Sequence, residues 1–257
     1  MNGAFYIGSV GLDAQQRALD IIANNIANVN TSTFKRSDVR FAEIMSIRMQ
    51  QPDALQLRDT ATSAAGGVMA SERFQLFSQG QIRPTGRATD LAIDGAGFIE
   101  LLGAAGQTTL WRGGSLQIND EGFLTAENGM VLRDRIAVPD GVMAVQIASD
   151  GSVSAIMGNG EQPVPLGEIG LVTVSDAAQL ERHDGGYYVP VEGARIDTGL
   201  AGENGNGLFV QGAVEGSNVE LSEEMVEMML VQRAFASNAQ IVQAADQMMG
   251  IANSLRR

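Results

Sequence analysis

The chain has 257 residues, a formal net charge of −13 and no cysteine. Nucleic acids and anionic membranes bind basic patches, so the acidic balance argues against both as partners. The absence of cysteine excludes disulfide bonds and thiolate metal sites.

The N-terminus and the apolar runs bear on targeting. The first residues, MNGAFYIGSVGLDAQQ, contain neither a basic leader nor an Ala-x-Ala cleavage site, so we expect no cleaved secretory signal. No apolar run approaches the roughly 20 residues that a membrane-spanning helix needs, so we expect no direct membrane insertion.

The first predicted element covers residues 1–34 and is a helix with heptad spacing. Leu12, Leu19 and Ile26 share one seam position, and Ile22 and Val29 share the other. This spacing is typical of helices that pair as in a coiled coil.

The end of this helix is rich in asparagine. Residues 21–34, IIANNIANVNTSTF, carry no charged side chain, whereas a surface helix normally carries Lys or Glu on its outer face. Neutral amides form hydrogen bonds across an interface without the desolvation cost of a buried charge. We therefore expect Asn24, Asn25 and Asn28 to face other subunits; the alternative is an intramolecular helical hairpin whose amides are exposed to water.

Residues 35–71 predict an extended arm or linker. Within it, Phe41 to Met49 is compatible with a short helix, and the run QQPDALQLRDTATSAAGGVMAS is typical of extended chain.

Residues 72–213 predict a β-rich outer domain. The segment VMAVQIA (142–148) alternates between apolar and other residues, and Asn128-Gly129 is a strong hairpin-turn signal. Strands and turns at such short spacing favour a mainly antiparallel β domain.

Residues 214–257 predict a second helix that packs with residues 1–34. Its seam contains Leu221, Met228, Phe235, Val242 and Met249, with Val231 in a second row that Glu224 and Asn238 interrupt. Ser217 followed by Glu220 has the spacing of a capping box at the start of the helix. The predicted fold is therefore α+β, with two terminal helices pairing as a helical layer and a β domain inserted between them.

Signals for catalysis are weak. The chain's single histidine, His183, precedes Asp184 in ERHDGGYY, which we interpret as an exposed turn because adjacent residues in a turn rarely face each other. No spacing matches a zinc site or an EF-hand, so we expect no catalytic residue, no cofactor and no metal.

Four stretches resemble one family. LDIIANNIANVNTSTFKR resembles the N-terminal signature of the bacterial flagellar rod and hook family, whose pattern maps onto Ala23, Asn24, Asn25, Ile26, Ala27, Asn28, Thr31, Phe34 and Lys35. SQGQIRPTGRATDLAIDGAGFI (78–99), GAVEGSNV (212–219) and MVEMMLVQRAF (225–235) are similar to further family segments. Thr33 stands where the family pattern has glycine, and a positive φ there would strain a threonine.

The resemblance implies a structural subunit of the flagellar basal-body rod and not an enzyme. Such subunits leave the cell through the flagellar export apparatus and assemble in the periplasmic space into a hollow helical tube, which transmits motor torque to the hook and conducts exported subunits. The implied partners are further copies of the chain, neighbouring rod and hook proteins, and ring proteins around the rod. Length and residues 45–71 favour a distal position in the rod, with proximal members close behind.

These considerations define a predicted assembly interface on the two terminal segments. Its residues are Leu12, Leu19, Ile22, Asn24, Asn25, Ile26, Asn28, Val29, Phe34, Lys35, Leu221, Met228, Val231, Phe235, Val242 and Met249. The alternative hypothesis is a β-rich secreted enzyme that acts on an extracellular polymer and oligomerises through its helical ends.

Overall fold

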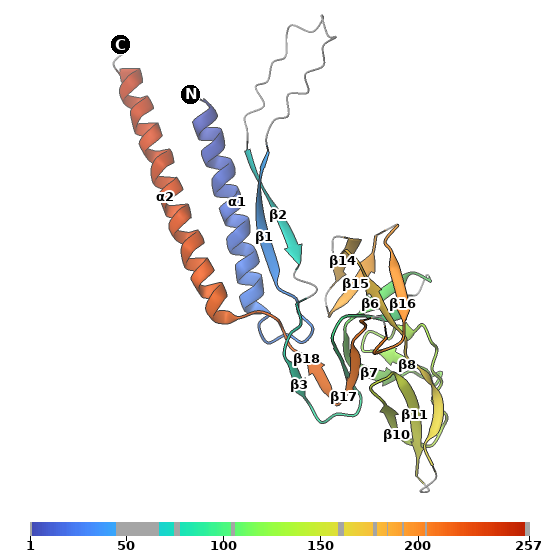
Figure 1. Ribbon diagram of the computed structural model, residues 1–257. Helices are drawn as coiled ribbons and strands as arrows, with labels where there is room; N and C mark the ends of the chain where they lie inside the picture. The colour runs from blue at the N-terminus through green and yellow to red at the C-terminus, as the bar shows by residue number, and fades with distance from the viewer. Residues whose placement is uncertain are drawn as a thin grey trace, which may run out of the picture. The chain divides into compact units, whose positions relative to one another are not determined.

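The computed structural model describes residues 2–44, 67–74, 78–103, 106–158, 162–176, 179–183, 185–191, 193–203 and 205–254. The chain forms two compact units (Figure 1). The helical unit comprises Met1–Ala27, Ser37–Arg73 and Glu220–Arg257, and the β unit comprises Asn28–Arg36 and Phe74–Val219. Each unit therefore combines segments from distant parts of the sequence.

The helical unit contains the two terminal helices. Helices α1 (Asn2–Ala27) and α2 (Leu221–Ser254) lie side by side (Figure 1). They run antiparallel, because Asn25 bonds to Glu224 near one end while Gly11 lies next to Asn238 further along. Both predicted terminal helices are therefore present, although α1 ends at Ala27 and does not continue to residue 34, and α2 begins at Leu221.

The helical unit also contains a two-stranded sheet. Strands β1 (Ser37–Ile44) and β2 (Gly67–Phe74) pair with each other. The short helix predicted for Phe41 to Met49 is wrong from Phe41 to Ile44, where the chain forms strand β1 instead. Residues 45–49 lie outside the described residues. In SDVRFAEI the apolar Val39 and Phe41 alternate with other residues, which is the period of a strand.

Helix α2 begins later than a capping box at Ser217 requires. The Ser217 hydroxyl instead accepts a hydrogen bond from the Val219 amide at 3.2 Å, as in a Ser turn, and the helix begins at Leu221. Asn218 keeps this segment extended. Its backbone N–H donates to the Phe34 carbonyl, and its side-chain Oδ1 accepts a hydrogen bond from the Arg36 backbone N–H. Glu223 and Glu224 lie in the first turn of α2, where acidic side chains interact favourably with the helix dipole.

The β unit contains a nine-stranded sheet within the described residues, in the order β14-β15-β6-β5-β9-β8-β7-β4-β17. A three-stranded sheet β10-β11-β12 and the pairs β13-β16 and β18-β3 complete it, and the paired strands are antiparallel. The strands are β3 (Ile82–Pro84), β4 (Asp90–Asp94), β5 (Ile99–Leu102), β6 (Thr108–Trp111), β7 (Gly113–Ile118), β8 (Leu124–Ala126), β9 (Val131–Leu132), β10 (Val142–Ile147), β11 (Ser152–Met157), β12 (Val164–Glu168), β13 (Leu171–Val174), β14 (Leu180–His183), β15 (Tyr187–Pro190), β16 (Ile196–Gly199), β17 (Leu208–Gln211) and β18 (Ala213–Glu215).

The sequence signals for strands in this unit are confirmed. The Asn128-Gly129 turn joins β8 to β9, with Gly129 at a φ of 81° that glycine adopts without strain. The alternating run 142–148 contains β10, which pairs with β11. The mainly antiparallel β domain predicted for the middle of the chain is therefore present.

Two apolar clusters form the core of the β unit. The larger cluster includes the fully buried Leu91, Ile93 and Leu101, and the smaller one surrounds Tyr188. Burying a large apolar side chain contributes about 1.5–3 kcal/mol, so these clusters supply the main stabilisation of the unit. Neither helix of the described chain has the length and apolarity to cross a membrane.

Candidate assembly interface

One stripe of α1 is buried within the helical unit. Ala14, Ala18, Ile22 and Asn25 each have at most 4% of their surface exposed and recur every three or four residues. Small alanines on this stripe allow close approach of the neighbouring elements. The predicted seam residues Leu12, Leu19, Ile26 and Val29 are only partly buried.

Asn25 joins three elements of the helical unit. The Ser37 amide of β1 donates to Asn25 Oδ1 at 3.0 Å, and Asn25 Nδ2 donates to the Ser37 carbonyl at 2.8 Å. Asn25 Nδ2 also donates to Glu224 Oε2 of α2 at 3.1 Å. We expected Asn25 to face another subunit. The residue is instead 1% exposed, and its side chain is hydrogen-bonded within its own chain. Asn24 is exposed and Asn28 is partly buried.

Lys35 and Phe34, also predicted at the interface, are buried inside the β unit. Lys35 Nζ donates to Glu215 Oε1 and, at 2.8 Å, to the Ser78 carbonyl. Burial lowers the pKa of Lys35, while the Glu215 carboxylate opposes that shift. Lys35, which we expected at the assembly interface, is instead buried and paired within the β unit of its own chain.

Two arginines complete this buried polar cluster. Arg112 Nε donates to Glu215 Oε2 at 2.8 Å, and the other nitrogens of Arg112 donate to the carbonyls of Gly95 and Gly97. The Arg182 guanidinium lies 4.1 Å from the centre of the Phe34 ring. Sequence reasoning missed the cluster; its only local signal was that Lys35 is the one lysine in the chain.

Thr33 has the backbone conformation that its family position implied. Its φ is 60°, and its amide donates to the Glu215 carbonyl at 2.8 Å. A β-branched residue at positive φ is strained, so the expected strain at this position is confirmed. Its side chain also lies against Gly186, where any Cβ would meet the Thr33 hydroxyl oxygen at 2.3 Å.

Helix α2 buries one side only. Glu224 is fully buried, and Met228, Val231, Asn238 and Val242 are partly buried. The predicted seam residues Leu221 and Phe235 are exposed at 46% and 37%, and the side chain of Met249 lies outside the described residues.

The rest of α2 exposes a large apolar surface, which we call the outer face of α2. Its exposed apolar side chains are Met225, Val226, Met229, Leu230, Ile241, Met248 and Ile251. By the helical period, Val226, Met229 and Ile251 point away from the buried Glu224 and Val231. A helix that is apolar on most sides is normally covered by other helices.

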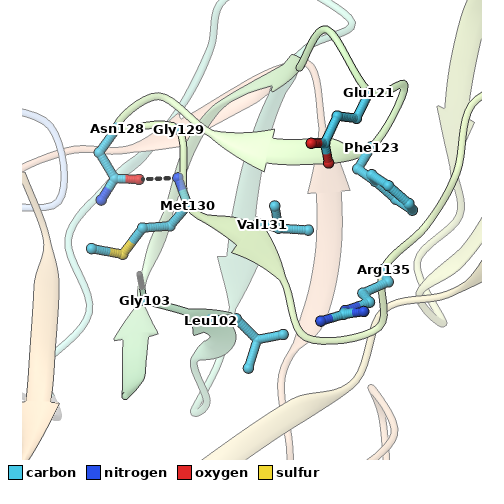
Figure 2. Close-up of a pocket in the computed structure, with 9 residues that line it drawn as sticks. All are labelled: Leu102, Gly103, Glu121, Phe123, Asn128, Gly129, Met130, Val131 and Arg135. Carbon is cyan, nitrogen blue, oxygen red and sulfur yellow. Dashed lines mark hydrogen bonds between the residues drawn. The ribbon is translucent and has the colours of Figure 1, made fainter. Parts of the chain in front are cut away.

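The β unit carries an open depression of about 730 Å³ (Figure 2). It is lined by Leu102, Gly103, Glu121, Phe123, Asn128, Gly129, Met130, Val131 and Arg135. The hydrogen bond drawn there runs from the Met130 amide to Asn128 Oδ1 at 3.0 Å and belongs to the hairpin turn itself. Asn128, Gly129, Met130 and Val131 come from this hairpin, and the other lining residues come from the end of β5, the loop before β8 and the turn after β9.

His183 lies at the end of β14, where it is exposed and pairs in register with Tyr187 of β15. Asp184 lies outside the described residues. Within the described part of the chain, no group of three or more His, Cys, Asp or Glu side chains is placed to hold a metal ion.

Comparison with protein families places three segments of the chain. Residues 5–35 match the model of the flagella basal body rod protein, residues 92–155 match the flagellar hook protein FlgE/F/G D1 domain, and residues 210–255 match the flagellar basal body rod FlgEFG protein C-terminal region. These segments include most of α1, part of the nine-stranded sheet and α2.

Curated relatives match over nearly the whole chain. The flagellar basal-body rod protein FlgG of Buchnera aphidicola subsp. Schizaphis graminum is 34% identical and that of Caulobacter vibrioides is 30% identical, each over 96% of both chains. The FlgG of Borreliella burgdorferi is 31% identical over 100% of both chains. The chain therefore belongs to the family of flagellar basal-body rod proteins of the FlgG type, whose members are structural subunits of the rod.

Proposed function

We propose that this rod subunit polymerises into a hollow helical tube, with the terminal helices as its inner layer and the β unit as its outer layer. The observation that carries the proposal is the outer face of α2. It exposes seven large apolar side chains between Met225 and Ile251, away from the side that contains Glu224 and packs on α1.

The free energy of burying this face favours association. Full burial of one such side chain contributes about 1.5–3 kcal/mol. The entropic cost of association is on the order of 4–15 kcal/mol, so several of these side chains must be buried together for stable assembly. We propose that the α1–α2 pair has coiled-coil packing and that Asn24 and the partly buried seam residues of both helices contribute to contacts between subunits.

A tube of this kind transmits motor torque to the hook and conducts exported subunits through its centre. The proposed role is mechanical and not catalytic, and we propose that the chain works in the periplasmic space after export without a cleaved signal. The relatives are named as basal-body rod proteins, which supports neighbouring rod proteins as partners. We further propose neighbouring hook proteins, surrounding ring proteins and the flagellar export apparatus as partners. We favour a distal position in the rod, with a proximal position as the alternative.

The test is concentration-dependent assembly of the purified full chain. Sedimentation and electron microscopy should detect polymers that grow with protein concentration. Met229→Lys, on the outer face of α2, should abolish them, because assembly would bury an unpaired ammonium. The matched control is Met143→Lys in β10, which makes the same change at a side chain that is 76% exposed. Loss of assembly in both variants, or in neither, would contradict the assigned face.

A further inference from the structure

The buried contact between Asn25 and Glu224 is unusual for two paired helices. Glu224 is 0% exposed and Asn25 is 1% exposed, and they meet on the side where α1 and α2 pack. In the sequence Glu224 and Asn238 interrupt a row that otherwise holds Val231, Ala245 and Ala252. A carboxylate at such a position adds specificity more readily than stability.

We propose that Asn25 and Glu224 determine the register in which α1 and α2 pair. A polar residue at one apolar seam position is an established means of fixing the alignment of helices. In the observed alignment the amide of Asn25 donates directly to the Glu224 carboxylate. A slip of one helical turn towards the middle of α1 would place Glu224 opposite Ile21 or Ile22, and neither side chain offers a hydrogen bond.

The Ser37 contacts make Asn25 the fixed member of the pair. Its amide exchanges two hydrogen bonds with the Ser37 backbone, at 2.8 and 3.0 Å, in the same way as a neighbouring strand would. These bonds hold the Asn25 side chain in one orientation. The remaining Nδ2 hydrogen is then directed at α2, where the Glu224 carboxylate accepts it in the observed alignment.

The register has a consequence for assembly. Rotation or translation of α2 against α1 would change which of its apolar side chains are covered by α1 and which are presented outward. The register pair therefore positions the outer face of α2. Register is a property of the single chain, so its test is independent of whether the chain forms the proposed tube.

The absence of cysteine permits a direct measurement in the full chain. Gly11→Cys with Asn238→Cys reports the native register, because a Cβ at position 11 would lie 3.7 Å from the Asn238 side chain. Gly11→Cys with Ala234→Cys and Gly11→Cys with Val242→Cys report slips of one turn in either direction. The chain is kept dilute, a short bismaleimide joins the thiols, and the ratio of native to slipped cross-links is measured.

Glu224→Leu is the main variant, because leucine suits an apolar helix contact and the protein should stay folded. We expect the ratio of native to slipped cross-links to fall by about tenfold or more. Glu224→Gln keeps a hydrogen-bond acceptor and should remain within about twofold of the parent. Glu223→Leu makes the same substitution at the exposed neighbouring position and should leave the ratio unchanged.

Asn25→Asp supplies a second, independent variant. It removes the donor to Glu224 and places two carboxylates together, so the ratio should fall as in Glu224→Leu. Adding Glu224→Gln should restore part of it, because the glutamine amide then donates to the new carboxylate. An unchanged ratio in Glu224→Leu, or no restoration in the double variant, would overturn the proposal and assign the register to apolar packing and the chain connections.

Discussion

Lys35, the only lysine in the chain, donates a hydrogen bond to Glu215, which lies 180 residues later. The two side chains are 1% and 0% exposed. Arg112 binds the second oxygen of the same carboxylate, and the Gly80 amide donates to the first at 2.9 Å. Inside the β unit, this cluster ties the segment that follows α1 to the segment that precedes α2.

Removal of the Glu215 charge should destabilise the β unit strongly. Glu215→Gln keeps the shape of the side chain but leaves the Lys35 and Arg112 cations buried side by side. Breaking a buried ion pair in this way costs about 3–5 kcal/mol. The pKa of Lys35 should also fall further, because Glu215 raises it in the parent. Urea unfolding followed by Trp111 fluorescence measures the free energy of unfolding.

Glu100→Gln is the matched control for this variant, because its partner Arg133 is 57% exposed. We expect a loss of about 1 kcal/mol or less there, since the arginine remains hydrated. Equal losses in the two variants would show that the buried cluster has no special role.

Replacement of Thr33 by glycine should stabilise the protein. A non-glycine residue at a φ of 60° carries about 1–2 kcal/mol of strain, whereas the extra freedom of glycine in the unfolded chain costs about 0.4–1 kcal/mol. We therefore expect a net gain of about 0.5–1 kcal/mol in thermal unfolding. Ser32→Gly, at the adjacent exposed position, relieves no such strain and should lower the stability. A loss of stability in both variants would mean that the Thr33 contacts with Gly186 outweigh the strain.

Tyr188 should make stability fall at alkaline pH. Burial raises its pKa to about 12, and its buried hydroxyl has no hydrogen-bond partner among the described residues. The unfolded tyrosine ionises near pH 10, so the stabilising contribution is complete below about pH 10 and is lost as the pH rises through about 12. The loss is on the order of 2 kcal/mol.

Tyr188→Phe isolates this effect from other groups that titrate in the same range. It should flatten the decline in stability between about pH 10 and about pH 12. At neutral pH it should stabilise the protein by up to about 1 kcal/mol, because an unsatisfied hydroxyl leaves the core. An identical alkaline decline in the parent and in Tyr188→Phe would assign it to another group.

The helical and β units should respond separately to a charge on α1. Ile22 is 3% exposed, so Ile22→Asp buries a carboxylate and should unfold the helical unit, at a cost of several kcal/mol. Limited proteolysis should then cleave α1 and α2 while the segments of the β unit, residues 28–36 and 74–219, stay protected. Ala23→Asp, at the adjacent exposed position, is the control and should leave both helices protected. Loss of protection in the β unit of Ile22→Asp would show that the units fold together.

Local patterns in the sequence determined the elements of this protein. The heptad runs identified α1 and α2, the Asn128-Gly129 pair identified a hairpin, and the glycine position in the family pattern identified the strain at Thr33. Each of these features depends on the period or the backbone preference of a few neighbouring residues, which a single sequence displays directly. The same patterns identified the family that the relatives confirm.

Only the tertiary structure decided which polar groups meet. Asn25 bonds to Glu224 across 199 residues and Arg112 bonds to Glu215 across 103, and no local period encodes such a partner. The heptad gave the apolar rows of α2, but the face that remains exposed depends on how α1 packs against it. An asparagine or a charged side chain can lie at a subunit interface or in a protein core, and its local sequence does not distinguish the two. Its final place depends on the packing and free energy of the whole fold.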